Sequence, residues 1–412
     1  MCARWPGSGD PCAAVISNMP SKPELLYLSP VIPAPTGNGL AMRSGMILEA
    51  LAEHYSISLL VVSLYPSPYV RVPEVFERLC RCSVVITRDQ FTRRTKSLLP
   101  SFLSNRFGRL PYHGSRFDVV HVFRLAMLAY ASPFLDGSYG TPRRHLDLDD
   151  IESETHTRLA ALSRSNGQKS RATFYEMEAR RYASVEEEAL NEFDRVYVCS
   201  EGDKSKLPAN HRAELCVLPN AVRFPEIVPR ESSDRVFTFL FAGTLGYYPN
   251  EDAVRYFGGE IVPLIRRSTR SEFVVNVVGT GASESLREFA SDSGMQMIGE
   301  VADIAPWYQN ASAVVVPLRA GGGTRIKVLE AFSHHRPVVS TSVGIEGIDA
   351  SDSQHVLIAD SPEVFAECCV RLMGDLSLRD RLVENAFSLV RQSYSTEAIK
   401  QIIASLFASP VH

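Results

Sequence analysis

From residue 25 onward, short apolar runs alternate with longer amphipathic stretches. Apolar runs of this length, bounded by turn-forming residues, are typical of strands that are buried on both faces of a parallel sheet. One helix is predicted over 41–54, and a polar helical stretch over 151–191 is broken near Asn166 and Gly167. The strands predicted in the first half are 25–29, 57–63, 83–87, 118–123, 144–148, 195–199 and 214–218.

The second half repeats this alternation after a proline-rich boundary over 219–235. Strands are predicted over 236–243, 273–281, 296–299, 313–317 and 337–341, with helices starting near Asn250, Ser283, Asp303 and Thr324. This order predicts an α/β protein with two doubly wound, Rossmann-like domains facing a central cleft. The expected parts are a disordered tail (1–22), an N-terminal Rossmann-like domain (23–218), a C-terminal Rossmann-like domain (219–393) and a C-terminal helix (394–412) that packs back on the first domain.

Charge and composition limit the kinds of partner and compartment that are expected for this protein. The 412 residues carry a formal net charge of -4, which gives no overall attraction to nucleic acid or to anionic membranes. No apolar run is long enough to span a bilayer, and the N-terminus lacks the apolar core of a secretory signal, so Met19 is an alternative start. The eight cysteines form no paired C-x-x-C set at zinc spacing. A cytoplasmic protein without a metal centre is expected.

The strongest chemical signal is PLRAGGGTRIKVLEAF. Three glycines, Gly321, Gly322 and Gly323, follow a predicted buried strand and precede a helix with Thr324 as its expected cap. Bare backbone amides at a helix N-terminus suit a phosphate or diphosphate, and Arg325 and Lys327 add positive charge. Glu330 would accept hydrogen bonds from sugar hydroxyls. The alternative is a tight turn with two solvated cations.

This segment, extended to PLRAGGGTRIKVLEAFSHHRPVVSTSVGIEGI, resembles the donor-binding signature of family 4 retaining glycosyltransferases, which have the GT-B fold. PAPTGNGLAMRSGMILEALAE, FDRVYVCSEGDKSKL, VLPNAV, FAGTLGYYPNEDAVRYF, VVGTG and IGEVADIAPWYQNASAVVVPL match other segments of the family in order, so the resemblance covers most of 25–400. It implies transfer of a sugar from a UDP-, GDP- or dTDP-linked donor, with retention of anomeric configuration and without a metal or other cofactor. The acceptor would be a glycan or other sugar, a lipid-linked molecule or a small natural product. By this resemblance the domain over 23–218 would bind the acceptor and the domain over 219–393 the nucleotide sugar.

Two departures from the family pattern bear on the site. The family often has a Glu-x7-Glu pair, and the position eight residues before Glu330 is Gly322. Many members also place Arg and Lys after the first strand of the second domain, where this chain reads GTLGYYPN. We therefore expect Arg325 and Lys327 to take over the contact with the diphosphate.

The resemblance adds donor-binding candidates at the ends of other strands. In the first domain, the loop over 36–39 would close over the diphosphate and sugar through Gly37 and Gly39. In the second domain, the candidates are Gly243, Thr244, Gly279, Ile298 and Val301, with the last two near the nucleotide base; a plain strand end is the alternative for each. Glu346 follows another strand and would either contact the donor or cap a turn.

Four residues of the first half have candidate roles in catalysis or acceptor binding. His121 and Arg124 end a predicted strand; His121 is either catalytic or packed, and Arg124 would contact a charged substrate. Asp149 and Asp150 are acceptor-site candidates, with capping of the following helix as the alternative. Together with Asp147 they form a D-x-D-D run that could ligate a cation. The surrounding strand and helix order does not fit the transferase fold that uses such a motif.

Basic residues interleave with Phe and Leu over Arg88–Arg109, which is typical of a segment that contacts an anionic membrane or a lipid-linked acceptor. A solvated loop is the alternative. Peripheral attachment at the inner face of the membrane would follow from the first reading.

Two further functions stay open: a nucleotide-sugar epimerase or phosphorylase on the same fold, and a non-catalytic partner protein. No lysine-bound cofactor site for a phosphorylase is evident in the sequence.

Overall fold

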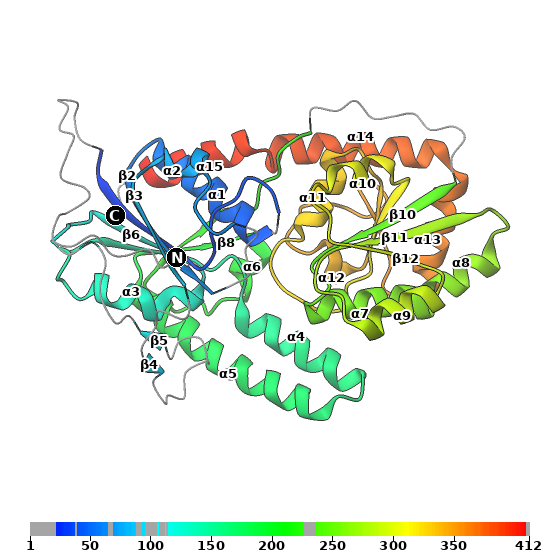
Figure 1. Ribbon diagram of the computed structural model, residues 1–412, viewed down its shortest axis with the longest axis horizontal. Helices are drawn as coiled ribbons and strands as arrows, with labels where there is room; N and C mark the ends of the chain where they lie inside the picture. Colours follow the sequence, from blue (N-terminus) through cyan, green and yellow to red (C-terminus); the bar gives the residue numbers. More distant parts are fainter. Residues whose placement is uncertain are drawn as a thin grey trace. The chain divides into compact units, whose positions relative to one another are not determined.

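The computed structural model describes residues 22–37, 39–64, 69–87, 93–94, 105–106, 112, 114–225 and 236–408. Described residues within 22–147, 192–195 and 407–408 form one compact unit, and those within 148–191 and 196–406 form a second. Hydrogen-bonded strands make a seven-stranded sheet, β3-β2-β1-β6-β7-β8-β9, and a six-stranded sheet, β12-β11-β10-β13-β14-β15 (Figure 1). The predicted α/β class with two doubly wound sheets is confirmed.

In the first unit, the central strand β1 pairs in parallel with β2 on one side and β6 on the other, so that Leu25 lies opposite both Ile57 and Val119. These strands are buried along nearly their whole length, as expected for continuous apolar runs. Helices α1 and α2 lie on one face of the sheet and α3 on the other (Figure 1). The elements are β1 (Glu24–Ser29), α1 (Gly39–Ala52), β2 (Ser56–Ser63), α2 (Glu74–Glu77), β3 (Cys80–Thr87), β4 (Arg93–Arg94), β5 (Asn105–Arg106), β6 (Val119–Phe123), η2 (Leu125–Met127), α3 (Leu128–Leu135) and β7 (Arg143–Asp147).

A buried ion pair joins α1 to β7. The guanidinium of Arg43 donates from Nε and Nη2 to the two carboxylate oxygens of Asp147, at 3.1 and 2.9 Å, and neither side chain is exposed. A bidentate pair of this kind satisfies both charges in a low-dielectric interior. Asp147 therefore serves as a structural anion, and the cation-ligand reading of the D-x-D-D run is wrong for this residue.

The second unit contains a helical hairpin and the six-stranded sheet. Helices α10, α11 and α14 lie on one face of that sheet, and α7, α8 and α9 on the other (Figure 1). The elements from the hairpin to the sheet's first helices are α4 (Glu152–Ser165), α5 (Lys169–Glu192), β8 (Arg195–Val198), α6 (Glu201–Lys206), β9 (Glu214–Val217), β10 (Phe237–Ala242), α7 (Tyr248–Tyr256), η3 (Phe257–Ile261) and α8 (Val262–Ser268). They are followed by β11 (Phe273–Val278), α9 (Glu284–Asp292), β12 (Gln296–Gly299), α10 (Ala305–Asn310), β13 (Ala313–Val316), α11 (Ile326–Ser333), β14 (Val338–Ser340), α12 (Ser342–Ile345), β15 (Leu357–Ile358), α13 (Pro362–Gly374), α14 (Leu376–Ser393) and α15 (Thr396–Ala408).

The order of the six strands determines where a ligand can bind. β10 pairs in parallel with β11 on one side and β13 on the other, so the chain changes direction of winding between β10 and β13. In open parallel sheets, ligands bind beyond the carboxyl ends of the strands at such a switch point. The loop after β10 and the glycine loop after β13 both lie there.

Candidate functional site

The glycine loop leaves β13 and enters α11 one residue later than expected. The helix begins at Ile326 with Arg325 in the N-cap position, so the prediction that Thr324 caps it is wrong. The reason is a tight turn, in which the amide of Ile326 donates to the carbonyl of Thr324 at 3.0 Å. The Thr324 hydroxyl is buried and has no hydrogen-bond partner in the described part of the chain.

Two guanidinium groups hold the carbonyls of the loop. Arg158, from α4, donates to the carbonyl of Gly321 at 3.3 Å. Arg325 donates from Nη1 to the carbonyls of Gly322 and Gly323, the latter at 2.6 Å. Because a peptide is planar and trans, the amide that follows each of these carbonyls points the opposite way.

The amides of residues 322–324 consequently face away from the guanidiniums. Among the described residues, none of these amides has an acceptor at hydrogen-bond distance. Consecutive amides that point into one space form an anion-binding concavity. Amides without an acceptor at this place suit an anion, and the phosphate-binding role of the loop stays a prediction.

Arg325 has further donors on the carbonyl side of the loop. Its side chain is 6% exposed, and Nε and Nη2 have no partner within the described residues. Burial lowers the pKa of the guanidinium, and the charge of Asp150 partly offsets this effect. A buried cation with two nitrogens that lack acceptors strongly favours an anionic ligand.

Lys327, in the first turn of α11, contacts residues of α7 and β10. Its ammonium donates to Oδ1 of Asn250 at 2.8 Å and lies 4.5 Å from the ring centroid of Phe241. The Asn250 amide in turn donates to the carbonyl of Thr244 at 2.9 Å. A Cβ on Gly243 would lie 2.7 Å from the Lys327 ammonium, so the glycine leaves room for it. Burial and the charge of Arg325 lower the pKa of Lys327 to about 7.

Glu330 lies one turn further along α11. Its Oε2 accepts a hydrogen bond of 2.9 Å from the hydroxyl of Tyr308, whose ring stacks on His334. Burial raises the pKa of Glu330 to about 7, although the bond from Tyr308 and the charge of Lys327 oppose the rise. Lys327 and Glu330 are thus a coupled pair with perturbed pKa values, which is typical of functional sites.

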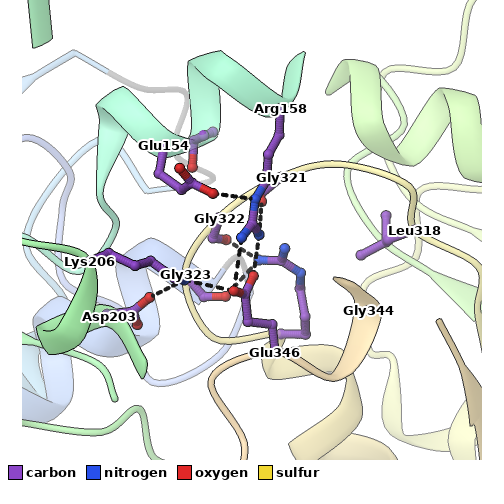
Figure 2. Close-up of polar contacts among 12 residues, drawn as sticks. Glu154, Arg158, Asp203, Lys206, Leu318, Gly321, Gly322, Gly323, Gly344 and Glu346 are labelled. Carbon is purple, nitrogen blue, oxygen red and sulfur yellow. Dashed lines mark hydrogen bonds and ion pairs between the residues drawn. The ribbon is translucent and has the colours of Figure 1, made fainter. Parts of the chain in front are cut away.

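Beside the glycine loop, Arg158 and Lys206 both point toward Glu346 (Figure 2). Arg158 forms a bidentate pair with the carboxylate, and Lys206 donates to it at 2.7 Å. Burial would raise the pKa of Glu346, but these bonds outweigh it and lower the pKa to about 2. The sequence offered two roles for Glu346, a donor contact or a turn cap. In the structure Glu346 is the C-cap residue of α12 and has two cationic partners, and a contact with the donor stays a prediction.

The other strand-end candidates of the second unit pack against protein atoms. A Cβ on Gly279, which has a φ of +155°, would overlap the carbonyl oxygen of Gly243. This close approach of two backbones requires glycine without any ligand. Ile298 and Val301 are partly buried against the hydrophobic core. Their assignment to the nucleotide base stays a prediction.

In the first unit, His121 lies in the core. It is fully buried, its ring centroid is 5.4 Å from that of Tyr27 and 6.2 Å from those of His145 and Phe407, and burial lowers its pKa to about 3. A neutral, enclosed imidazole fits the packing alternative, and a role for His121 in catalysis has no geometric support.

Three other candidates in this unit have special backbone conformations or positions. Gly37 has a φ of +114°, Gly39 begins α1, and Asn38 between them lies outside the described residues. Arg124 directly follows β6 and has a φ of +74°, which is unusual for a residue with a side chain. Its amide donates to the carbonyl of Asp147 at 2.7 Å. Their contacts with substrate stay predictions.

The two acceptor candidates differ in their surroundings. Asp149 has a φ of +57°; its carbonyl accepts from the thiol of Cys199 at 3.0 Å, and Oδ1 lies 3.4 Å from the amide of Asn220. Asp150 lies against the glycine loop, and its carboxylate accepts from the Thr155 hydroxyl at 2.9 and 3.0 Å.

Most of the basic segment Arg88–Arg109 lies outside the described residues. Its described parts, β4 and β5, form an antiparallel pair. In the portion of the chain that the structure covers, no helix combines the length and apolar character needed to cross a membrane.

Comparisons with known proteins agree with this geometry. Residues 236–375, which contain the six-stranded sheet and the glycine loop, match the family model of glycosyl transferases group 1. A stretch of 176 residues is 24% identical to an uncharacterized 44.6 kDa protein in the cps region of Klebsiella pneumoniae. That match covers 41% of this chain and 44% of the relative, so this chain spans less than half of the length of that relative.

Solved structures are similar over almost the whole chain. Sucrose-phosphate synthase from Thermosynechococcus elongatus has a TM-score of 0.66 at 14% identity, over 94% of this chain and 98% of its own. HepE from Anabaena, in complex with UDP and glucose, has the same score and identity over 94% and 100%. A glycosyltransferase from Rickettsia africae has a TM-score of 0.61 at 13% identity over 94% and 100%. The chain therefore has the GT-B fold of these structures, and its residues 236–375 match the glycosyl transferases group 1 family.

Proposed function

We propose that this protein is a glycosyltransferase that moves a sugar from a nucleoside diphosphate sugar to an acceptor. The glycine loop carries the proposal: its carbonyls are held by Arg158 and Arg325, while the amides of 322–324 are left for an anion. The HepE structures contain UDP and UDP-glucose, which supports a nucleotide sugar as the ligand of the same fold here. The donor is a UDP-, GDP- or dTDP-linked sugar.

The proposed reaction depends on stabilising negative charge. The bond between the anomeric carbon and the diphosphate oxygen breaks, and a bond to the acceptor oxygen forms. The electron pair of the broken bond goes to the diphosphate, which also takes the proton of the acceptor hydroxyl. Arg325, Lys327 and the loop amides would stabilise this charge as it develops. A bound diphosphate would also raise the pKa of Lys327 above its value of about 7 and keep it protonated.

Glu330 would bind hydroxyl groups of the donor. Its carboxylate already accepts from Tyr308 through Oε2, which fixes its orientation and leaves Oε1 for a ribose or sugar hydroxyl. Resemblance to the family 4 enzymes favours retention of anomeric configuration and a hexosyl donor. Because Arg325 and Lys327 supply positive charge, we expect turnover without a metal ion.

The acceptor is a glycan or other sugar, a lipid-linked molecule or a small natural product. We expect the protein to act in the cytoplasm. The basic segment Arg88–Arg109 would place it at the inner face of the membrane if the acceptor is lipid-linked.

A panel of UDP-, GDP- and dTDP-linked sugars tests the function. Each is incubated with the protein, and free nucleoside diphosphate and released sugar are measured. Slow release of diphosphate from one donor, accelerated by an acceptor extract, is the expected result. Conversion of the donor to its epimer would instead identify an epimerase. A complete lack of both reactions and of donor binding would indicate a non-catalytic protein.

A further inference from the structure

An acidic side chain is packed against the anion-binding loop. A Cβ built on Gly322 would overlap Oδ1 of Asp150 and Oγ1 of Thr155. A Cβ on Gly323 would lie 3.3 Å from the carbonyl of Asp149. The segment that precedes α4 therefore occupies the space in which side chains of the glycine loop would otherwise stand.

The carboxylate of Asp150 has a fixed orientation. The hydroxyl of Thr155, which is 3% exposed, donates to both of its oxygens. The amide of Asp150 donates to the carbonyl of Leu148, which makes the turn before α4 tight. An oriented carboxylate at this place cannot move far from the loop.

The negative charge of Asp150 is unexpected beside a loop that binds anions. Burial lowers the pKa of Arg325, and the charge of Asp150 is close enough to offset part of this fall. Nε and Nη2 of Arg325 have no hydrogen-bond partner in the described part of the chain. A negative charge there weakens the attraction of the loop for phosphate. The carboxylate of Asp150 can also accept hydrogen bonds from hydroxyl groups. A sugar has such donors, whereas a terminal phosphate at neutral pH does not.

We propose that Asp150 is a specificity-determining residue that makes the glycine loop prefer a glycosylated diphosphate to a free nucleoside diphosphate. This inference rests on the proposed function. A terminal phosphate loses a second proton near a pH of about 6, so the free diphosphate carries more negative charge than its sugar ester. Repulsion from Asp150 is therefore stronger for the free diphosphate, while the sugar hydroxyls of the ester are hydrogen-bond donors to it.

The same repulsion acts on the product. When the sugar leaves, the diphosphate gains charge beside Asp150 and loses the hydroxyl donors. Release of the diphosphate is thereby favoured, and inhibition by it is weakened.

Calorimetric titration of the intact protein tests this inference with the pairs UDP and UDP-glucose, GDP and GDP-mannose, and dTDP and dTDP-glucose. For the pair that the wild-type protein binds, the quantity of interest is Kd of the diphosphate divided by Kd of the sugar nucleotide. D150N keeps the shape of the side chain and removes its charge. It should lower this ratio about tenfold, mainly by tightening the diphosphate.

D292N is the matched control, because Asp292 is an exposed carboxylate on α9 and its removal changes the net charge equally. Its ratio should equal that of the wild type. T155V removes the hydroxyl that orients Asp150 and should also lower the ratio. This variant serves as the test if D150N does not fold. An unchanged ratio in a folded D150N or T155V overturns the role of Asp150 alone. A wild-type protein that binds no member of the panel overturns the proposed function and this inference with it.

Discussion

Lys327 donates a hydrogen bond of 2.8 Å to Asn250 and in this way connects α11, the helix after the glycine loop, to α7. The same ammonium lies over the ring of Phe241. Both contacts restrain a flexible side chain, and burial brings its pKa close to neutrality. The charge state of the site therefore depends on pH in the physiological range.

We predict a bell-shaped pH profile of kcat/KM for the active donor. Glu330, with its pKa raised to about 7, must be ionised to accept from a hydroxyl, so activity falls as the pH decreases through this value. Lys327, with its pKa lowered to about 7, must be protonated, so activity falls as the pH increases through it. The two limbs report the pair together.

Tyr308 provides the control for this profile. Its hydroxyl stabilises the ionised form of Glu330, so Y308F should raise the pKa of Glu330 and move the acidic limb to higher pH. The basic limb should move less. A profile that is flat over about two pH units around neutrality would contradict the assignment of both residues.

Glu346 should contribute to stability in a defined pH window. Its pKa is about 2 in the folded protein against 4.5 for the unfolded carboxyl, so the stabilisation is complete above 4.5 and is lost as the pH falls from 4.5 toward 2. The loss corresponds to at most about 3 to 4 kcal/mol, since the two pKa values differ by about 2.5 and one pKa unit is about 1.4 kcal/mol. Urea unfolding of the wild type and E346Q at several pH values measures it; an equal acid dependence of the two proteins would show that Arg158 and Lys206 do not stabilise this charge.

Gly279 should be essential for folding and not replaceable by alanine. The added Cβ would overlap the carbonyl of Gly243, and the strained φ of +155° excludes relief by a small shift. We expect G279A to lose about 3 kcal/mol or more of unfolding free energy, as large steric clashes do. G259A is the control, because its Cβ would meet only Phe289, at 3.6 Å, and its stability should change by less than about 1 kcal/mol. Equal stabilities in the two variants would refute the steric explanation.

The sequence was sufficient for local features of the site. The buried strand β13, the three glycines and the cations of α11 are contiguous, so their order alone predicts an anion-binding loop at a strand end. The predicted break of the long helical stretch near Asn166 and Gly167 agrees with the boundary between α4 and α5. The exception is Thr324, because the amide of Ile326 forms its own tight turn before the helix begins.

Partners from distant elements could not be predicted in this way. Arg158, Lys206 and Asn250 are ordinary polar residues on helices, and only the fold brings them to Glu346 and Lys327. Helices α13 and α14 were missed for another reason. No element was predicted over 350–393, although the buried residues of α14 recur at helical spacing, at Leu378, Leu382, Ala386 and Val390. That pattern is a signal that the sequence does contain.

Turnover of K327A with the active donor tests the central claim most directly, with K169A as a control because Lys169 is an exposed lysine on α5. The proposed stabilisation of the departing diphosphate predicts that kcat of K327A falls about 100-fold or more, while K169A keeps the wild-type rate. A K327A protein that is folded and turns over within about threefold of the wild type would contradict the assignment of this site to the transfer reaction.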